Sequence, residues 1–143
     1  MTIHLDYCLA LQRAHASVQL KLDDALGTFH GISFSDFVLL DLLAQTTNGK
    51  QRMDALVRPL GQRLPLVLRQ LITLEKIGLI GREGSRAQRY AVLRPAGRAL
   101  RNLARETAGD ICSAAFAAAD MAPPEKVCDS LLALSLTSAL ALS

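Results

Sequence analysis

The sequence lacks tryptophan and has only four phenylalanines and two tyrosines among its 143 residues. So few aromatic rings argue against a sugar-binding platform and against an RNA-binding sheet that stacks bases on aromatic side chains. Aliphatic residues and alanine must build the core instead. Because half of the residues are hydrophobic, the chain has enough of them for one compact domain, with residues 1–143 forming a single unit.

Cysteines are few, and the recurring spacings of a disulfide framework or zinc motif are missing: Cys8, Cys112 and Cys128 are an odd, widely separated set. Asp6 lies where a signal peptide needs a basic residue, and the longest uncharged apolar stretch, residues 131–142, is too short to span a bilayer. We therefore expect a cytoplasmic protein that binds no membrane, metal or other cofactor. No nucleophile elbow, phosphate loop or paired-carboxylate site is present, so we expect no catalytic residues and no enzyme.

The charge is distributed unevenly along the chain. Residues 1–49 hold two basic and five acidic side chains, residues 50–105 hold thirteen and three, and residues 106–143 hold one and five. The net charge of +3 therefore conceals a middle segment of +10 between acidic ends. Such a segment is typical of a surface that meets phosphate groups, although a solvated arginine-rich surface is the alternative.

Apolar periodicity predicts a first helix over residues 4–28. Ser33 and Asp36 have the spacing of a capping box, in which each side chain bonds to the backbone amide of the other, and this predicts the start of a second helix ahead of the apolar run at residues 37–43. A short third helix fits residues 53–58, where Pro59 is expected to stop it. A fourth helix fits residues 64–77, with Val67, Leu71 and Leu74 on its buried face, and the three-residue turn before it makes a helix-turn-helix candidate.

Two short strands are predicted next, at residues 79–82 and 88–93, with residues 83–87 as the hairpin loop. A long helix follows over residues 95–119, with an apolar stripe through Leu100, Leu103, Thr107, Ile111 and Ala115. Four arginines, at positions 94, 98, 101 and 105, line one side of its start, either as phosphate ligands or as a solvated stripe. The last helix is predicted over residues 127–142.

Three blocks of this sequence, in this order, resemble the MarR family of transcription regulators. They are Ile32-Ser33-Phe34-Ser35-Asp36-Phe37, the stretch Leu74-Glu75-Lys76-Ile77-Gly78-Leu79-Ile80-Gly81-Arg82, and Leu93-Arg94-Pro95-Ala96-Gly97-Arg98-Ala99-Leu100. The second and third are similar to the family's L-E-x-x-G-L-V-x-R and L-T-P-x-G-R-x-L blocks. The resemblance implies a mainly α winged helix-turn-helix fold with a small β-hairpin wing.

The resemblance also implies a homodimer that binds double-stranded DNA at a pseudo-palindromic operator, most often as a repressor. Residues 1–30 and 120–143 would be the dimerisation helices, and residues 33–100 the DNA-binding lobe. An ordinary intramolecular core helix is the alternative for the apolar C-terminal run. In a dimer, two recognition helices one turn of DNA apart would read the two half-sites.

Candidate DNA-contacting residues come from the helical wheel and from the family pattern. Arg69 faces away from the buried side of the fourth helix, and Arg86 at the wing tip matches the family's minor-groove arginine. The complete candidate set is Gln62, Arg63, Arg69, Thr73, Arg82, Arg86 and Arg89.

The recognition helix departs from the family pattern at its start. Residues 64–68, Leu-Pro-Leu-Val-Leu, replace the usual small polar residues. Apolar side chains can contact thymine methyl groups but supply no donor or acceptor, so base readout would be weak or would depend partly on DNA shape. This departure supports an alternative function, a MarR-like dimer that binds a protein partner through this apolar helix.

Family members commonly respond to small aromatic ligands or to oxidants. His15, Phe34 and Phe37 are the candidate ligand-binding residues, with ordinary core packing as the alternative. Cys8-Leu9-Ala10-Leu11 resembles the C-F-A-L segment of the family's organic-peroxide sensors, and Cys128 lies where two-cysteine sensors keep a resolving thiol. The second alternative function is therefore a peroxide sensor that uses Cys8, with a buried inert thiol as the structural alternative.

Overall fold

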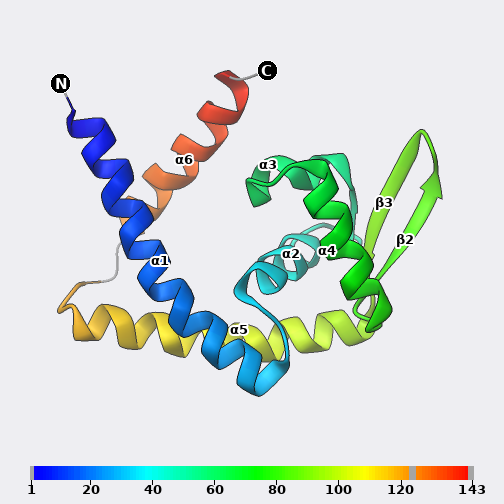
Figure 1. The fold of residues 1–143 in the computed structure, drawn as a ribbon, viewed down its shortest axis with the longest axis horizontal. Coiled ribbons are helices and arrows are strands. Elements are labelled where there is room, and N and C mark those ends of the chain that lie inside the picture. Colours follow the sequence, from blue (N-terminus) through cyan, green and yellow to red (C-terminus); the bar gives the residue numbers. More distant parts are fainter. Residues whose placement is uncertain (1, 123–124, 142–143) are drawn as a thin grey trace.

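The computed structural model describes the backbone of residues 2–122 and 125–141 and the side chains up to Leu136. Within these residues the chain is mainly helical, with a small antiparallel sheet (Figure 1). In chain order, the elements are α1 (Ile3–His30), α2 (Phe34–Ala44), β1 (Lys50–Arg52), the 3-10 helix η1 (Asp54–Leu56), α3 (Val57–Leu60), α4 (Leu64–Lys76), β2 (Ile80–Ser85), β3 (Gln88–Leu93), α5 (Pro95–Ala118) and α6 (Glu125–Ala141).

The long helices form an arm beside a compact lobe. α1 crosses α5, and α6 turns away from the end of α5, so that both chain ends lie on the same side of the molecule (Figure 1). The ring of His30 on α1 lies 2.7 Å from the hydroxyl of Thr107 on α5. Within the described residues, no single helix is long and apolar enough to cross a membrane, and α1 and α2 meet such a test only as a pair bent by 77°.

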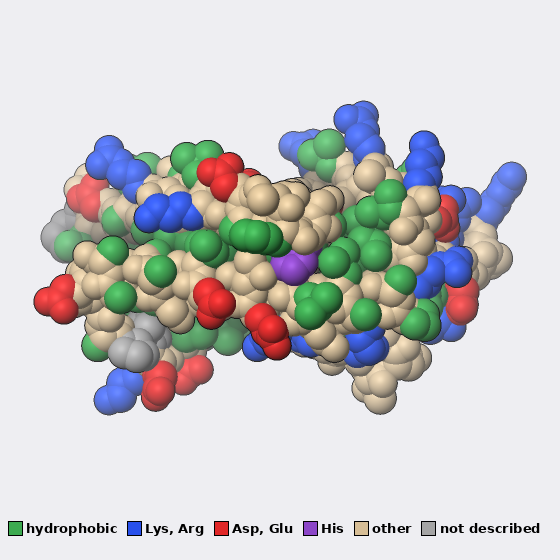
Figure 2. Space-filling model, turned by 90° about the horizontal axis from the view of Figure 1, so that it is seen from below, with side chains coloured by type: hydrophobic (Ala, Val, Ile, Leu, Met, Phe, Trp, Pro, Cys, Tyr) green, Lys and Arg blue, Asp and Glu red, His purple; other side chains and the backbone are tan. Residues whose placement is uncertain are grey.

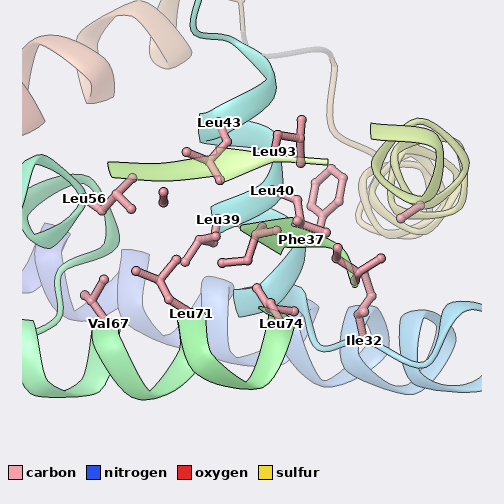
Figure 3. Packing of buried hydrophobic residues seen from close by; sticks show 14 of the residues in the cluster. Ile32, Phe37, Leu39, Leu40, Leu43, Leu56, Val67, Leu71, Leu74 and Leu93 are labelled. Carbon is pink, nitrogen blue, oxygen red and sulfur yellow. The ribbon is translucent and has the colours of Figure 1, made fainter. Parts of the chain in front are cut away.

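The lobe has one hydrophobic core, built from α2, α4 and the sheet. Leu39, Leu40 and Leu43 of α2 are fully buried; Leu39 points toward Leu71 of α4, and Leu43 lies beside the strand that carries Leu93 (Figure 3). This burial explains the spacing of Val67, Leu71 and Leu74, each at most 1% exposed, because three- and four-residue steps keep one face of α4 inward. The buried face predicted for this helix is confirmed.

The capping box predicted for α2 is confirmed. The hydroxyl of Ser33 accepts a hydrogen bond from the Asp36 backbone amide at 3.0 Å, and the Asp36 carboxylate accepts one from the Ser33 amide at 3.1 Å. A carboxylate of α1 also caps this helix, because Asp23 accepts a hydrogen bond from the Phe34 backbone amide at 2.7 Å. The start of α2 is therefore fixed both locally and against the arm.

The sheet has the strand order β1-β3-β2, with both pairs antiparallel. β1 was not predicted, because Lys50-Gln51-Arg52 is short and polar and shows no apolar alternation. β2 runs to Ser85, so the wing turn contains only Arg86 and Ala87, and the prediction of a five-residue loop is wrong. Gly84, with φ of +97°, permits this extension, since a Cβ there would overlap the Gln88 carbonyl group.

Two predictions about helix interiors are wrong. Pro59 does not stop the third helix, because it lies in the single turn of α3, where a missing amide proton costs little, and the turn ends at Gly61. On α5, Leu103 is 57% exposed instead of belonging to the buried stripe. Leu100 and Ile111 of the predicted stripe are partly buried against the core, and the fully buried positions of α5 are Gly97, Ala104 and Ala108.

Candidate nucleic-acid interface

α4 and the β2–β3 hairpin lie next to each other at one end of the molecule (Figure 1). Because Val67, Leu71 and Leu74 point into the core, the opposite side of α4 is open to solvent, and it presents Arg69. Arg63, directly before the helix, is also exposed and has extended backbone geometry. The helix therefore offers one long exposed face to a partner.

A hollow of about 300 Å³ lies on one side of this face, between α4 and the start of α2. It brings together three of the predicted DNA-contacting residues, namely Gln62, Arg69 and Thr73, with Leu66 beside them. The Thr73 hydroxyl donates to the backbone carbonyl of Arg69 at 3.1 Å, so its proton is used within the helix.

A second hollow, of about 260 Å³, lies between the start of α4 and the wing. It collects Arg86 from the wing turn and Arg89 from β3, both predicted, beside Leu64 and Leu68 of α4. Arg52 on β1 also lines it and was missed, because its strand has no recognisable sequence pattern; it forms an ion pair with Asp54 at 2.8 Å.

Arg82, another predicted DNA-contacting residue, forms an ion pair within the protein. Its Nε lies 3.1 Å and its Nη2 lies 2.9 Å from the two carboxylate oxygens of Glu75 on α4. The hydrogen bonds and charge of Arg82 lower the pKa of Glu75, and Glu75 in turn raises the pKa of Arg82. This pair connects the wing to the C-terminal end of α4.

The arginines at the start of α5 bind the lobe. Arg101 donates to the Asp41 carboxylate of α2 at 2.7 Å, and both side chains are only 18% exposed. Arg94 donates to the Ile80 carbonyl at 3.0 Å, and Arg105 lies 3.3 Å from Asp41. The interpretation of this row as phosphate ligands or a solvated stripe is therefore wrong for Arg101, whose pairing partner lies 60 positions away in the sequence.

Once these internal pairs are set aside, four of the predicted DNA-contacting residues remain as exposed cations around α4 and the wing. Within the part of the chain that the structure describes, Arg63, Arg69, Arg86 and Arg89 take part in no ion pair. Figure 2 shows lysine and arginine side chains gathered at the end of the molecule that carries the wing. An unpaired cluster of this kind attracts a polyanion.

The candidate ligand residues lie together where α1 meets α2. The rings of His15 and Phe34 have centroids 6.1 Å apart, and those of Phe34 and Phe37 are 6.2 Å apart and stacked. Phe37 is 8% exposed and belongs to the core. Core packing accounts for Phe37, whereas Phe34 is half-buried and His15 is exposed, and the role of all three in ligand binding stays a prediction.

An apolar cavity of about 270 Å³ lies elsewhere, between α1 and α5. Val18, Cys112 and Phe116 line it, with Lys21 as its charged group. Burial raises the pKa of the Cys112 thiol, which keeps this sulfur protonated at neutral pH. The two predicted redox residues, Cys8 on α1 and Cys128 on α6, are free thiols that are exposed in the single chain, and both lie in the segments predicted to form the dimer interface, so their redox role stays a prediction.

No protein-family model matches the chain, and no curated protein matches it. Solved structures do match. BldR, a transcriptional regulator from Sulfolobus solfataricus, superposes with a TM-score of 0.82 at 16% identity, over 93% of this chain and 94% of that one. The described elements therefore define a winged helix-turn-helix fold.

Two further solved structures show which kind of winged helix fold the chain has. The MarR-family regulator Sco3205 from Streptomyces coelicolor, solved in complex with DNA, gives a TM-score of 0.77 at 20% identity and covers 100% of this chain and 89% of its own. CouR from Rhodococcus jostii RHA1, solved with p-coumaroyl-CoA, gives 0.78 at 18% identity and covers 88% of each chain. This chain has the MarR-type winged helix fold, which confirms the fold predicted from the sequence.

Proposed function

We propose that this protein is a homodimeric transcription regulator that binds double-stranded DNA. One observation carries the proposal: Arg63 and Arg69 at α4, and Arg86 and Arg89 on the wing, are exposed and free of ion pairs within the described residues, and they lie at one end of the molecule. In this geometry α4 would enter a major groove while Arg86 reaches the adjacent minor groove.

Dimerisation is supported by the apolar side chains along the arm. Leu5 and Leu9 of α1 are 58% and 56% exposed, and Leu132 and Leu136 of α6 are 61% and 68% exposed. A monomer that exposes so many large aliphatic side chains would aggregate, so burial between two copies is the stable arrangement. We assign residues 1–30 and 120–143 to this interface and residues 33–100 to the DNA-binding lobe. Residues 1, 123–124 and 142–143 of these segments lie outside the described part.

We further propose that the protein acts as a repressor whose DNA affinity changes with a small, mostly apolar ligand. The cavity between α1 and α5 supports a ligand, because its apolar lining and single cation, Lys21, suit a small molecule with an acidic group. The complex of CouR with p-coumaroyl-CoA supports the same idea at the level of the fold.

The proposal is tested by selection of bound sequences from a random duplex library, followed by affinity measurements at several salt concentrations. We expect a pseudo-palindromic site and a linear fall of log affinity with log salt concentration. Light scattering should give the mass of two chains, and truncation after Ala122 should give an aggregating product.

Other outcomes separate the alternatives. If the protein binds no duplex and instead captures a protein partner with an affinity that does not depend on salt, the alternative function, protein binding through the apolar helix α4, would be supported. The peroxide-sensor alternative is motivated by the free thiols of Cys8 and Cys128, which lie on the two helices assigned to the dimer interface. It requires that an organic hydroperoxide releases bound DNA and yields a Cys128-dependent crosslink, and that Cys8→Ser abolishes both effects.

A further inference from the structure

The exposed face of α4 is apolar to an unusual degree for a surface that meets DNA. Leu66 and Ile72 are 50% and 39% exposed on the sides of α4 next to Arg69, and Leu64, at the start of the helix, is 40% exposed. Leu66 and Ile72 flank Arg69 at three residues on either side, so these side chains form one row along the helix. The row is part of the surface assigned above to DNA.

The polar side chains of α4 are mostly unavailable for reading bases. The Gln70 amide nitrogen donates to the Asp36 carboxylate at 2.9 Å and to the Ser35 hydroxyl at 3.2 Å. The hydroxyl of Thr73 is bonded to a backbone carbonyl, and Glu75 is bonded to Arg82. Before Lys76 in the last turn, only Arg69 of the described α4 side chains keeps free donors on the exposed face.

Apolar side chains can still read sequence, because the major-groove edge of thymine carries a methyl group that the other three bases lack. Arginine reads guanine through two acceptors on the same edge. We propose that Leu66 and Ile72 recognise thymine methyl groups on either side of a guanine contacted by Arg69. Sequence preference then depends more on methyl burial than on hydrogen bonds.

The surroundings of the row favour DNA over a protein as its occupant. Leu64 shares its hollow with Arg86 and Arg89, and Leu66 shares its hollow with Arg69. Apolar side chains interleaved with unpaired cations suit a duplex, where methyl groups lie between two rows of phosphates. This inference rests on the proposed function, and its experiment distinguishes the two.

The experiment uses the selected duplex with deoxyuridine in place of thymidine at one position at a time. Deoxyuridine keeps the pairing edge, O4 and the phosphate charge, and lacks only the methyl group. We expect about a fourfold loss of affinity for each contacted methyl that is removed. Leu66→Ala should bring the thymidine-to-deoxyuridine affinity ratio close to one at its position, with the salt slope unchanged.

Arg86→Ala is the matched control, because the wing lies in the other groove. It should lower affinity for both duplexes equally and leave their ratio intact. Ile72→Ala provides a second variant on the row in case Leu66→Ala unfolds, which circular dichroism would show. Salt-dependent duplex binding with equal affinity for thymidine and deoxyuridine at every position would overturn the inference and leave the proposed function standing. Absence of binding to any duplex would overturn both.

Discussion

The guanidinium group of Arg82 on β2 and the carboxylate of Glu75 on α4 form a two-point contact, with N to O distances of 2.9 and 3.1 Å. The pair connects the base of the wing to the last turn of the helix assigned to the major groove. It also withdraws one cation from the DNA-facing surface, because the Arg82 charge is neutralised by a partner in the same chain. Removal of Glu75 should therefore change DNA binding in a definite direction.

Glu75→Gln should strengthen binding to every duplex, since it removes a negative charge and frees Arg82 for a phosphate. The slope of log affinity against log salt should become steeper by about one for each protomer. Glu106→Gln, an exposed change on α5, removes the same charge without freeing an arginine and should leave the slope unchanged. Weaker binding by Glu75→Gln with an unchanged slope would show that the pair holds the wing in its binding position.

The same pair gives a pH dependence of stability. Because Arg82 lowers the folded-state pKa of Glu75 below its value of 4.5 in the unfolded chain, the contact contributes stability above pH 4.5. That contribution is lost as the pH falls through the folded-state pKa. The difference in unfolding midpoint between wild type and Glu75→Gln should therefore close in strong acid, and a difference that grows there would contradict the assignment.

Asp41 holds the lobe to the arm, and its loss should destabilise the fold. Asp41→Asn weakens the half-buried contact with Arg101, and we expect a loss of about 1–2 kcal/mol in the free energy of unfolding. Arg101→Ala should cost a similar amount. Arg105→Ala removes the more exposed partner, 62% accessible and 3.3 Å away, and should change stability by less than about 0.5 kcal/mol. Urea unfolding of the three variants checks this order.

Periodicity predicted the helices and the helix-turn-helix well, because burial of one face leaves a clear pattern, as at Val67, Leu71 and Leu74. It did not predict β1, whose three polar residues are held by pairing with β3, a long-range contact. Pro59 was misread because its effect depends on where in a helix it falls. Short elements follow tertiary pairing more than local sequence.

The candidate site was predicted less completely than the fold. The sequence could locate Arg69 and Arg86, because the helical wheel of α4 places Arg69 on the exposed face and the predicted hairpin places Arg86 at the tip of the wing. Sequence could not show that Arg82 is bonded to Glu75, or that Arg101 is bonded to Asp41, because pairs across elements leave no periodic signal. The +10 charge of the middle segment therefore overstates the charge available to a partner.

Close packing requires a glycine at position 97, in the third block that resembles the MarR family. A Cβ at this position would overlap the Leu79 carbonyl oxygen, because the first turn of α5 packs directly against the backbone that leads into β2. Gly97→Ala should destabilise the protein by roughly 1–3 kcal/mol. Gly109→Ala, in the same helix with open space around it, should instead stabilise by up to about 1 kcal/mol. Thermal unfolding that shifts both variants in the same direction would contradict this packing argument.

Arg69 and Arg86 should contribute different kinds of binding, because Arg69 would enter the major groove and Arg86 the adjacent minor groove. Arg69→Ala removes a bidentate base contact and should cost about 1–3 kcal/mol at the preferred site, with relaxed selectivity at one base pair. Arg86→Ala should weaken binding to every duplex, and most to those with narrow minor grooves, where the negative potential is strongest. The measurement is titration of each variant against the selected site, a scrambled duplex and an A-tract duplex at several salt concentrations. Arg105→Ala, on α5 outside both the DNA-binding lobe and the dimerisation segments, is the matched charge control and should behave as wild type. Unchanged affinity and salt slope in both test variants would place the DNA-binding face elsewhere on the molecule.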